Sequence, residues 1–374
     1  MAENRNAFLL VQGGVHEQLP AAGRPLHLEA VTHRLTCRRY RLPFLRVVRT
    51  AHGPWREREG LLVRTEDEAG LAGYGEVAPI PSFGTETLAE AERALDGLGG
   101  RVDAAAVAGM GERLGCVRFA LAAALEADSA GPPAAERLPV TALLPAGRAA
   151  FAAADEARDR GHVAFKWKVG VLAAADELAM LDDLLARLPA GAQLRLDANG
   201  AWTTRQAAKW LERCVERPIE FVEQPCLAEA APGTAGRRRS EDILLGLAHD
   251  YPTTLALDES VTGLASLRAW LERGWPGVVV VKPALAGPPA AILALLSAHR
   301  SDAVFSSAFE TAVGRRAALR MAFFFKGRQP PRALGFGVIP LFKDARFEGL
   351  PAAPFVSGED INRMNLEAAW NALS

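Results

Sequence analysis

Two lysines, Lys166 and Lys168, stand one residue apart in the apolar stretch "VAFKWKVG". Residues two apart in a β-strand point to the same face, so both ammonium groups should lie on one side of a strand. Lysine is rarely buried without a partner. The stretch therefore predicts a charged site on that side, with Phe165, Trp167 and Val169 packing on the other.

Acidic residues and a third lysine recur further along the chain at similar intervals. Short apolar runs end at Asp197, Glu223, Asp258 and Lys282, and successive members from Lys166 onward are 24 to 35 residues apart. Each interval is about the length of one strand–helix unit. Because the carboxyl ends of parallel barrel strands form one rim, where the active site lies, these side chains are expected to meet there.

Three carboxylates at one rim would repel one another and raise each other's pKa unless a cation joined them. An all-oxygen ligand set favours Mg²⁺, with Mn²⁺ as an alternative. No histidine or cysteine ends a predicted strand, which disfavours zinc. In the competing interpretation each acid only caps the following helix, which explains one such acid better than three in succession.

The lysines fit the same chemistry. Lys282 lies four predicted strands beyond Lys166 and Lys168 and should approach from the opposite side of the barrel. Amino groups on both sides of a metal-bound carboxylate suit abstraction of an α-proton, since metal and ammonium stabilise the enolate that forms. Nearby positive charges also favour the neutral form that a lysine base needs. The alternative is a simple salt bridge between a lysine and an adjacent acid.

From about Leu138 the chain alternates between short apolar runs and amphipathic segments such as Ala174–Leu188. This alternation predicts parallel β/α units, and eight of them close into a barrel. An open doubly wound sheet is the alternative, but no Gly-x-Gly-x-x-Gly follows a run. The eight runs are "LPVTALL", "VAFKWKV", "QLRLD", "IEFVE", "TLALD", "VVVVK", "AVFSS" and "ALGFGV".

The first third of the chain has a different pattern. Two extended runs around the acidic turn Glu66–Gly70 predict a small antiparallel sheet, and helices are predicted over Thr87–Leu98 and Cys116–Asp128. The fold class is therefore α/β, a (β/α)8-type barrel with an N-terminal α+β domain. The predicted divisions are an extension over 1–26, an α+β domain over 27–135, the barrel over 136–340 and a C-terminal segment over 341–374 that returns to the α+β domain.

The composition narrows the class of partner. A net charge of −1 offers no basic surface for nucleic acid or an anionic membrane, and no apolar run approaches the ~20 residues of a membrane helix. The four cysteines are far apart and are expected to be free thiols in a reducing compartment. We expect a cytoplasmic protein with a small-molecule carboxylate substrate. The sequence does not indicate an oligomeric state.

The stretches "KWK", "LRLDANGAW", "FVEQP", "LALDES" and "VVVKPA" occur in the order and spacing found in a known family. They resemble the muconate-lactonizing subgroup of the enolase superfamily. The resemblance runs from about Leu28 to the C-terminus and includes "YGEVAPIPSFGTETL", which is similar to the family's capping domain. It implies a modified TIM barrel, a capping domain and bound Mg²⁺.

Within this subgroup the chain is most similar to the o-succinylbenzoate synthase family. That resemblance implies a hydro-lyase of menaquinone or phylloquinone biosynthesis, which dehydrates 2-succinyl-6-hydroxy-2,4-cyclohexadiene-1-carboxylate to o-succinylbenzoate through α-proton abstraction. The stretch "LGFGVIPLF" lacks the acidic pair of dipeptide epimerases, and "AVFSSAFE" lacks the histidine of mandelate-racemase-like members. N-Acylamino-acid racemization and muconate-type cycloisomerization use the same lysine pair and remain alternatives.

The resemblance also implies roles for individual residues. Lys168 abstracts the proton and then helps hydroxide to depart, Lys166 assists electrostatically, and Lys282 stacks over the opposite face of the intermediate. The implied metal ligands are Asp197, Glu223 and Asp258.

Around these residues, the resemblance implies that Asn199 and Glu259 hold the metal ligands in place. It also implies that Ser306 and Ser307 donate hydrogen bonds to a substrate carboxylate and that Gly337 leaves room for substrate.

The loops expected to close over the barrel and set specificity are Arg49–Glu59 and Ala78–Thr87. Two other classes stay as competing hypotheses, a metal-independent Schiff-base barrel enzyme and a barrel without catalysis.

Overall fold

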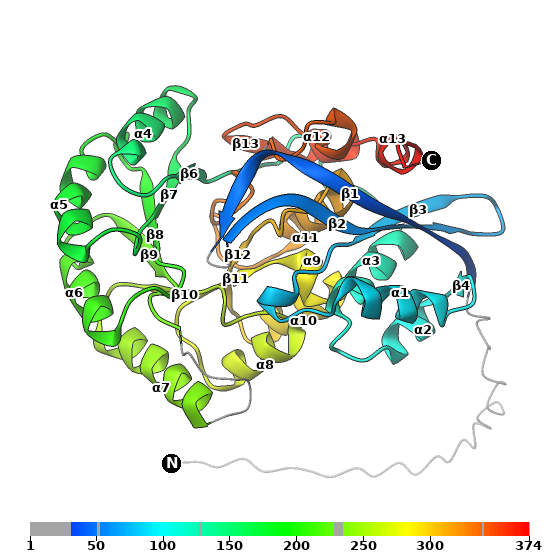
Figure 1. Ribbon diagram of the computed structural model, residues 1–374, viewed down its shortest axis with the longest axis horizontal. Helices are drawn as coiled ribbons and strands as arrows, with labels where there is room; N and C mark the ends of the chain where they lie inside the picture. Colours follow the sequence, from blue (N-terminus) through cyan, green and yellow to red (C-terminus); the bar gives the residue numbers. More distant parts are fainter. Residues whose placement is uncertain (1–30, 51–52, 127–128, 228–234, 339, 374) are drawn as a thin grey trace, which may run out of the picture. The chain divides into compact units, whose positions relative to one another are not determined.

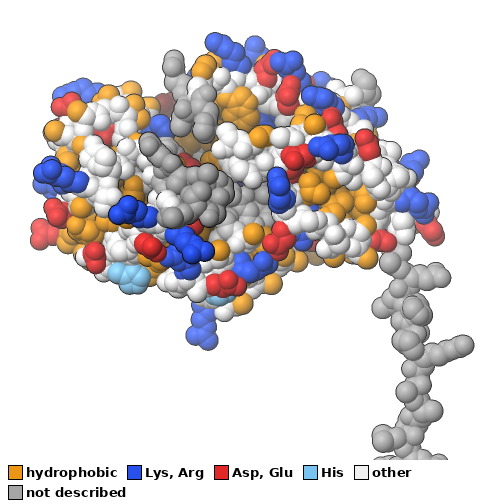
Figure 2. All heavy atoms as spheres, turned by 60° about the horizontal axis from the view of Figure 1, so that its bottom comes forward, with side chains coloured by type: hydrophobic (Ala, Val, Ile, Leu, Met, Phe, Trp, Pro, Cys, Tyr) orange, Lys and Arg blue, Asp and Glu red, His pale blue; other side chains and the backbone are white. Residues whose placement is uncertain are grey.

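The protein is described here by a computed structural model. Within the described residues no helix is both long and apolar enough to cross a membrane. The extension predicted over 1–26 lies outside them. On the face that Figure 2 presents, basic and acidic side chains are interspersed, in keeping with the net charge of −1. The described ranges are 31–50, 53–126, 129–227, 235–338 and 340–373.

An antiparallel sheet opens the described chain, with strand order β3-β2-β1-β4 (Figure 1). The loop predicted over Arg49–Glu59 is wrong in part, because from Gly53 onward these residues belong to β2 and pair with β1. Cross-strand charge pairs favour the hairpin, as between Arg41 Nε and Glu57 Oε2 at 2.6 Å. The strands are β1 (His33–Thr50), β2 (Gly53–Glu66), β3 (Ala72–Val77) and β4 (Arg101–Val102).

Three helices accompany this sheet: α1 (Leu88–Asp96), α2 (Ala104–Gly109) and α3 (Gly115–Leu125). Helix α1 begins at a capping box in which Thr87 and Glu90 bond each other's backbone N–H. Helix α3 packs closely on β3, since a Cβ at Gly75 would lie 1.9 Å from the Ala120 carbonyl oxygen. We call residues 33–125 the N-terminal module.

The central element of the described chain is a sheet of seven parallel strands, which follow one another in sequence order from β6 to β12. Leu334 bridges to Val140 and Gly335 bridges to Ser306, both in parallel, so this pair occupies the eighth position and joins the two edges. The strands are β6 (Ala142–Leu144), β7 (Ala164–Lys168), β8 (Gln193–Asp197), β9 (Ile219–Glu223), β10 (Leu255–Leu257), β11 (Val278–Val281) and β12 (Asp302–Phe305).

Two of the predicted runs differ from the structure. The run "LPVTALL" is divided, because β5 (Arg137–Pro139) pairs with β13 (Phe355–Ser357) outside the barrel and only Ala142–Leu144 enters it. Pro139, which has no N–H to donate, stands at the division. The run "ALGFGV" contributes two bridging residues instead of a full strand.

Helices cover the outer face of the barrel, and Figure 1 shows α4 to α8 following one another outside the strands. Trp167 is fully buried on this face, and its ring contacts that of Trp210 on α6 with centroids 6.3 Å apart. The helices are α4 (Ala149–Asp159), α5 (Ala174–Leu185), α6 (Thr204–Cys214), α7 (Ala235–Asp250), α8 (Leu264–Glu272), α9 (Pro283–Ala286), α10 (Pro289–Ala298) and α11 (Ala312–Phe324). A separate apolar cluster fills the interior: Phe221, Ala256, Val278, Val280 and Val304.

The C-terminal part, with α12 (Gly358–Asn362) and α13 (Leu366–Asn371), contacts the N-terminal sheet. Phe342 forms an antiparallel bridge with Phe44 of β1, and their rings stack with centroids 5.7 Å apart. The ends of the described chain therefore share one apolar cluster.

Candidate active site

Five of the charged residues singled out from the sequence stand at the carboxyl ends of neighbouring strands. Lys168, Asp197 and Glu223 lie in one row across β7, β8 and β9, because Lys168 pairs with Asp197 and Asp197 with Glu223. Asp258 and Lys282 directly follow β10 and β11. Together with Lys166 we call them the rim cluster.

Direct contacts join members of the rim cluster. The Lys166 ammonium lies 3.0 Å from Asp197 Oδ2 and 2.9 Å from Glu223 Oε1. Lys282 forms an ion pair with Asp258. Lys168 instead donates a hydrogen bond to the amide oxygen of Asn199.

Asn199 links several of these groups. Its backbone N–H donates to Asp197 Oδ1 at 3.1 Å, and its side-chain amide donates to Glu259 Oε1 at 3.0 Å. Its φ of 45° lies in the left-handed region, which asparagine tolerates better than most residues. Asn199 thereby fixes the orientation of Asp197 and holds the side chain of Lys168.

Gln224 was missed by the sequence interpretation, although it stands within the quoted "FVEQP". It is fully buried, and its amide oxygen accepts the backbone N–H groups of Asp258 and Ser260, each at 3.1 Å. This side chain therefore sets the turn that carries Asp258. The signal available in the sequence was its position directly after Glu223.

The rim carboxylates differ in their protonation behaviour. Burial, together with the charges of Asp197 and Asp258, raises the pKa of Glu223 to about 8. Burial also opposes ionisation of Asp197, but the neighbouring Lys166 and Lys168 hold its pKa below the ordinary value. Although burial disfavours the ammonium, the three carboxylates raise the pKa of Lys166. The rim acids are therefore close enough to act on one another.

An aromatic ring from the N-terminal module reaches the rim. Phe83, in the expected loop Ala78–Thr87, places its ring centroid 4.2 Å from the Lys282 ammonium. Such a cation–π contact stabilises a partly buried ammonium. Phe83 is not among the residues predicted from sequence, although it is the one aromatic residue in that loop.

Ser306 and Ser307 follow β12, and both hydroxyl protons are directed to protein acceptors. Ser306 Oγ donates to the Gly335 carbonyl at 3.1 Å, and Ser307 Oγ donates to Glu310 Oε1 at 2.9 Å. Gly337 is required by packing, because a Cβ there would lie 2.1 Å from the Thr141 carbonyl oxygen. Close backbone approach therefore explains this glycine better than the expected space for substrate.

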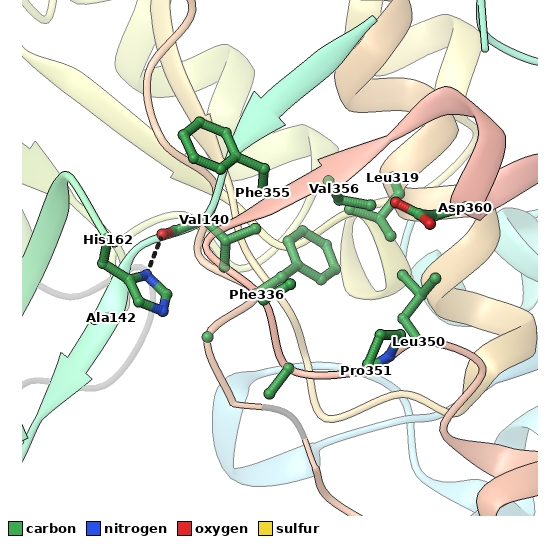
Figure 3. Close-up of a pocket in the computed structure, with 13 residues that line it drawn as sticks. Val140, Ala142, His162, Leu319, Phe336, Leu350, Pro351, Phe355, Val356 and Asp360 are labelled. Carbon is green, nitrogen blue, oxygen red and sulfur yellow. Dashed lines mark hydrogen bonds between the residues drawn. The ribbon is translucent and has the colours of Figure 1, made fainter. Parts of the chain in front are cut away.

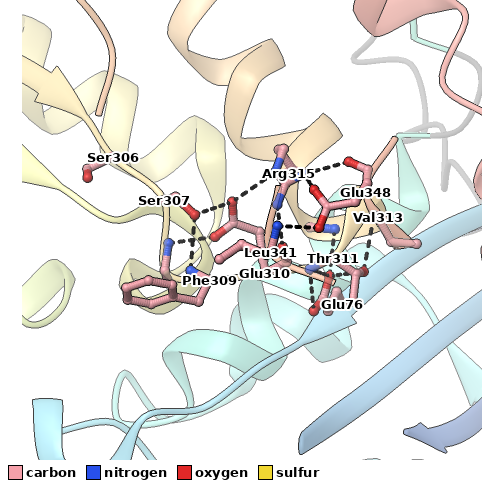
Figure 4. A network of polar contacts seen from close by, with 12 residues as sticks. Glu76, Ser306, Ser307, Phe309, Glu310, Thr311, Val313, Arg315, Leu341 and Glu348 are labelled. Atoms are coloured by element: carbon pink, nitrogen blue, oxygen red, sulfur yellow. Dashed lines mark hydrogen bonds and ion pairs between the residues drawn. The ribbon is translucent and has the colours of Figure 1, made fainter. Parts of the chain in front are cut away.

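A second buried acidic group lies where α11 meets the N-terminal module and the C-terminal part (Figure 4). Glu76 of β3 accepts hydrogen bonds from Thr311 and Gly314 at the start of α11. Arg315 lies 3.3 Å from Glu348 Oε2 and 3.8 Å from Glu310 Oε1. We call Glu76, Glu310, Glu348 and Arg315 the interface cluster.

The rim acids suit a hard divalent cation. Their donor set is three buried carboxylates, and burial together with the charges of the other two raises the pKa of Glu223, a conflict that a cation would relieve. Among the described residues no three acidic, histidine or cysteine side chains already form a closed metal cage. In this arrangement the Lys166 ammonium joins Asp197 to Glu223.

A cavity of about 80 Å³ lies elsewhere, between the eighth barrel position and the C-terminal part (Figure 3). His162 borders it and contacts the Val140 carbonyl oxygen through Nδ1 at 3.0 Å. The rim lysines and carboxylates do not line this cavity. Its lining is mostly apolar, and its two polar side chains, His162 and Asp360, lie on opposite sides of it in Figure 3. It holds none of the rim residues, so it is not the candidate active site.

Comparison with known proteins agrees with this geometry. The family model "MenC, N-terminal domain" matches residues 32–127, and "Enolase C-terminal domain-like" matches residues 149–339. An o-succinylbenzoate synthase from Thermosynechococcus vestitus is 40% identical over 304 residues, which cover 80% of this chain and 90% of that protein.

Solved structures show the same relationship. An o-succinylbenzoate synthase from Thermosynechococcus elongatus BP-1, complexed with Mg in its active site, matches with a TM-score of 0.78 and 35% identity over 91% of this chain and 99% of that one. The L-Ala-D/L-Glu epimerase of Bacillus subtilis matches with a TM-score of 0.72 and 20% identity over 88% and 96%, and so shares the fold. These matches confirm the predicted barrel with its capping domain, and they also confirm the resemblance to the enolase superfamily. The chain belongs to the o-succinylbenzoate synthase family of the enolase superfamily.

Proposed function

We propose that this chain dehydrates 2-succinyl-6-hydroxy-2,4-cyclohexadiene-1-carboxylate to o-succinylbenzoate with the help of Mg²⁺, as a step of menaquinone or phylloquinone biosynthesis. The observation that carries the proposal is the ion-paired rim cluster, in which the Lys166 ammonium contacts Asp197 and Glu223 at 3.0 and 2.9 Å. It occurs in a chain 40% identical to an o-succinylbenzoate synthase.

Asp197, Glu223 and Asp258 would hold the ion, with Mn²⁺ as the alternative to Mg²⁺. Asn199 and Glu259 would orient these ligands through the hydrogen bonds already described. Bound there, the ion would stabilise the negative charge that develops on the substrate carboxylate. Lys166, held between two of the acids, would add a fixed positive charge on the same side.

Lys168 is the proposed base. Its amine takes the α-proton of the substrate and then returns a proton to the departing hydroxide, so that one water leaves and the ring becomes aromatic. The hydrogen bond to Asn199 fixes the position of this amine. Lys282, held by Asp258 and the Phe83 ring, would face the opposite side of the substrate.

Ser306 and Ser307 are proposed to lie near a substrate carboxylate. Each hydroxyl has a single proton, and both protons are already donated within the protein. Substrate would therefore have to replace the Gly335 carbonyl as the acceptor for Ser306. Ser307 would act through the shape of its loop.

The decisive test is an assay with the cyclohexadiene substrate, with and without EDTA, on the wild type and on Lys168→Ala. Removal of a general base should lower kcat on the order of 10³-fold, while the melting temperature and Mg²⁺ binding stay unchanged. Lys209→Ala, which removes an exposed lysine on α6, is the control and should keep full activity. Activity that survives EDTA, with a borohydride-trapped lysine adduct, would instead establish the Schiff-base alternative.

A further inference from the structure

Two loops from different parts of the chain flank the candidate active site. The loop Ala78–Thr87 belongs to the N-terminal module and brings Phe83 over Lys282. The loop Ser306–Thr311 joins β12 to α11 and begins with Ser306, which bridges to the eighth barrel position. The geometry of the site depends on where both loops are held.

Arg58 of β2 binds the backbone of both loops. On the first loop, its guanidinium donates to the Pro79 carbonyl at 2.8 Å and to the Ala78 carbonyl. On the second loop, it donates to the Phe309 carbonyl at 3.2 Å and to the Ala308 carbonyl at 3.4 Å. One side chain therefore ties the two loops together.

The environment of Arg58 is unusual for a charged residue. Its side chain is only 1% exposed, and within the described ranges no carboxylate forms an ion pair with it. A buried charge is costly unless hydrogen bonds satisfy it, and here carbonyl oxygens supply those bonds. The planar guanidinium, with five N–H donors, can reach several carbonyls at once, whereas a lysine ammonium is a compact point charge.

Phe309, one of the residues bound by Arg58, has a strained backbone. Its φ of 59° lies in the left-handed region, which is unfavourable for a bulky side chain. Such strain persists only where surrounding contacts hold it. Here the Phe309 N–H donates to Ser307 Oγ at 3.0 Å, and its ring meets Trp55 of β2 with centroids 5.6 Å apart (Figure 4 shows the loop).

We propose that Arg58 is a positioning residue of the active site, which braces the two loops so that Phe83 stays over Lys282 and Ser306 stays at the rim. Arg58 does not touch the rim cluster itself and acts only through these loops. The inference rests on the proposed function for its catalytic consequence. The brace itself is a structural claim that can be measured separately.

The test compares Arg58→Met and the milder Arg58→Lys with the wild type. Since small misplacements of an active-site group can cost on the order of 100-fold, we expect kcat/KM of Arg58→Met to fall by roughly that factor, with part of the loss as a higher KM. The kcat/KM of Arg58→Lys should fall on the order of tenfold, because lysine keeps the positive charge but lacks the planar guanidinium that reaches several carbonyls at once. Mg²⁺ affinity should not change in either variant.

Hydrogen exchange supplies the local readout. Peptides that cover 78–87 and 306–311 should exchange faster in both variants, whereas strands β8 to β10 should keep wild-type protection. Thr65→Val is the matched control, because it removes a different buried hydrogen bond of the same strand, from Thr65 Oγ1 to the Ala124 carbonyl at 2.9 Å. It should lower the melting temperature without changing kcat/KM or exchange in the two loops.

Each outcome decides the proposal. Wild-type kcat/KM in folded Arg58→Lys and Arg58→Met would overturn it, and so would faster exchange spread evenly over the N-terminal module. If Arg58→Met does not fold, Arg58→Lys alone decides. If the wild type is inactive with this substrate, the proposed function fails, and exchange in the two loops still shows whether Arg58 braces them.

Discussion

The protein contains two buried groups of three carboxylates, and they differ in what binds their oxygens. Three belong to the rim cluster and three to the interface cluster, and none is more than 8% exposed. Burial alone therefore does not distinguish a functional acid from a structural one. The six residues are Asp197, Glu223 and Asp258 at the rim, and Glu76, Glu310 and Glu348 at the interface.

In the interface cluster, backbone N–H groups supply many of the hydrogen bonds. Glu76 accepts the N–H groups of Thr311 and Gly314, and also the Tyr40 hydroxyl at 2.6 Å. Glu348 accepts the N–H groups of Leu341 and Phe342. Backbone donors cannot move away without local unfolding, so these carboxylates stabilise the fold and are not free to bind an ion.

In the rim cluster, lysine side chains make most of the contacts with the carboxylate oxygens. Among the described residues only one backbone N–H reaches a rim carboxylate, that of Asn199 on Asp197. A lysine side chain can rotate away and release a carboxylate oxygen, whereas a backbone N–H cannot. The comparison indicates that acids able to bind an ion are recognised by having side-chain partners that can move away. Burial and charge distinguish them less well, because both clusters share these properties.

The largest expected effect comes from removing one rim acid. Glu223→Gln should abolish measurable Mg²⁺ binding in calorimetry and lower kcat/KM on the order of 10³-fold or more, because the ion loses an anionic ligand. The melting temperature in EDTA should stay level or rise, because glutamine replaces a side chain whose ionisation is opposed by burial and by the two neighbouring carboxylates. Intact Mg²⁺ binding in this variant would remove Glu223 from the proposed ligands.

The matched change in the interface cluster should have the opposite outcome. Glu76→Gln replaces an acceptor by an amide whose NH₂ faces donors, at the start of α11, where negative charge is favourable. We expect the free energy of unfolding to fall by about 3 kcal/mol and the Mg²⁺ dissociation constant to stay within about twofold. Urea unfolding and calorimetry measure the two quantities, and loss of Mg²⁺ binding at unchanged stability would invalidate the comparison.

A smaller effect is expected from pH on the ion-free protein. The pKa of Glu223 is about 8 in the folded protein against an ordinary 4.5, so between these values the folded protein keeps a proton that the unfolded chain has lost. Stability should therefore fall as pH rises through this window. Melting in EDTA checks the sign, since a melting temperature that increased from about pH 6 to about pH 8 would contradict it, and Glu223→Gln should flatten the curve.

The barrel and the position of its charged residues could be predicted from sequence because both signals are local. Each strand is a short apolar run, and a charge at its carboxyl end, as at Asp197 or Glu223, repeats with the length of one unit. The roles of individual side chains came instead from the family resemblance. Spacing alone does not separate a proton-abstracting lysine from a salt-bridged one.

What the sequence could not predict depends on contacts between distant segments. Glu76 and Thr311 are 235 residues apart, and no local pattern pairs them. Arg58 falls within the loop predicted over Arg49–Glu59, whereas pairing with β1 makes it a buried strand residue. The eighth barrel run pairs only through Leu334 and Gly335, and periodicity records neither this short pairing nor the close approach of Gly337 to the Thr141 carbonyl.

The smallest expected effect concerns two adjacent serines. Ser306 stands beside the rim cluster, and Ser307 contacts the interface cluster. Ser307 makes this contact by donating to Glu310, and it also accepts the N–H of Phe309, so Ser307→Ala should cost about 1 kcal/mol of unfolding free energy. Among the described groups the Ser306 hydroxyl is bonded only to the Gly335 carbonyl, so Ser306→Ala should raise KM several-fold and leave the melting temperature nearly unchanged. Steady-state kinetics and thermal melts on both variants measure this. If Ser307→Ala raised KM more than Ser306→Ala, the substrate carboxylate would lie nearer the interface cluster than we propose. Ser307, rather than Ser306, would then be the serine that binds substrate.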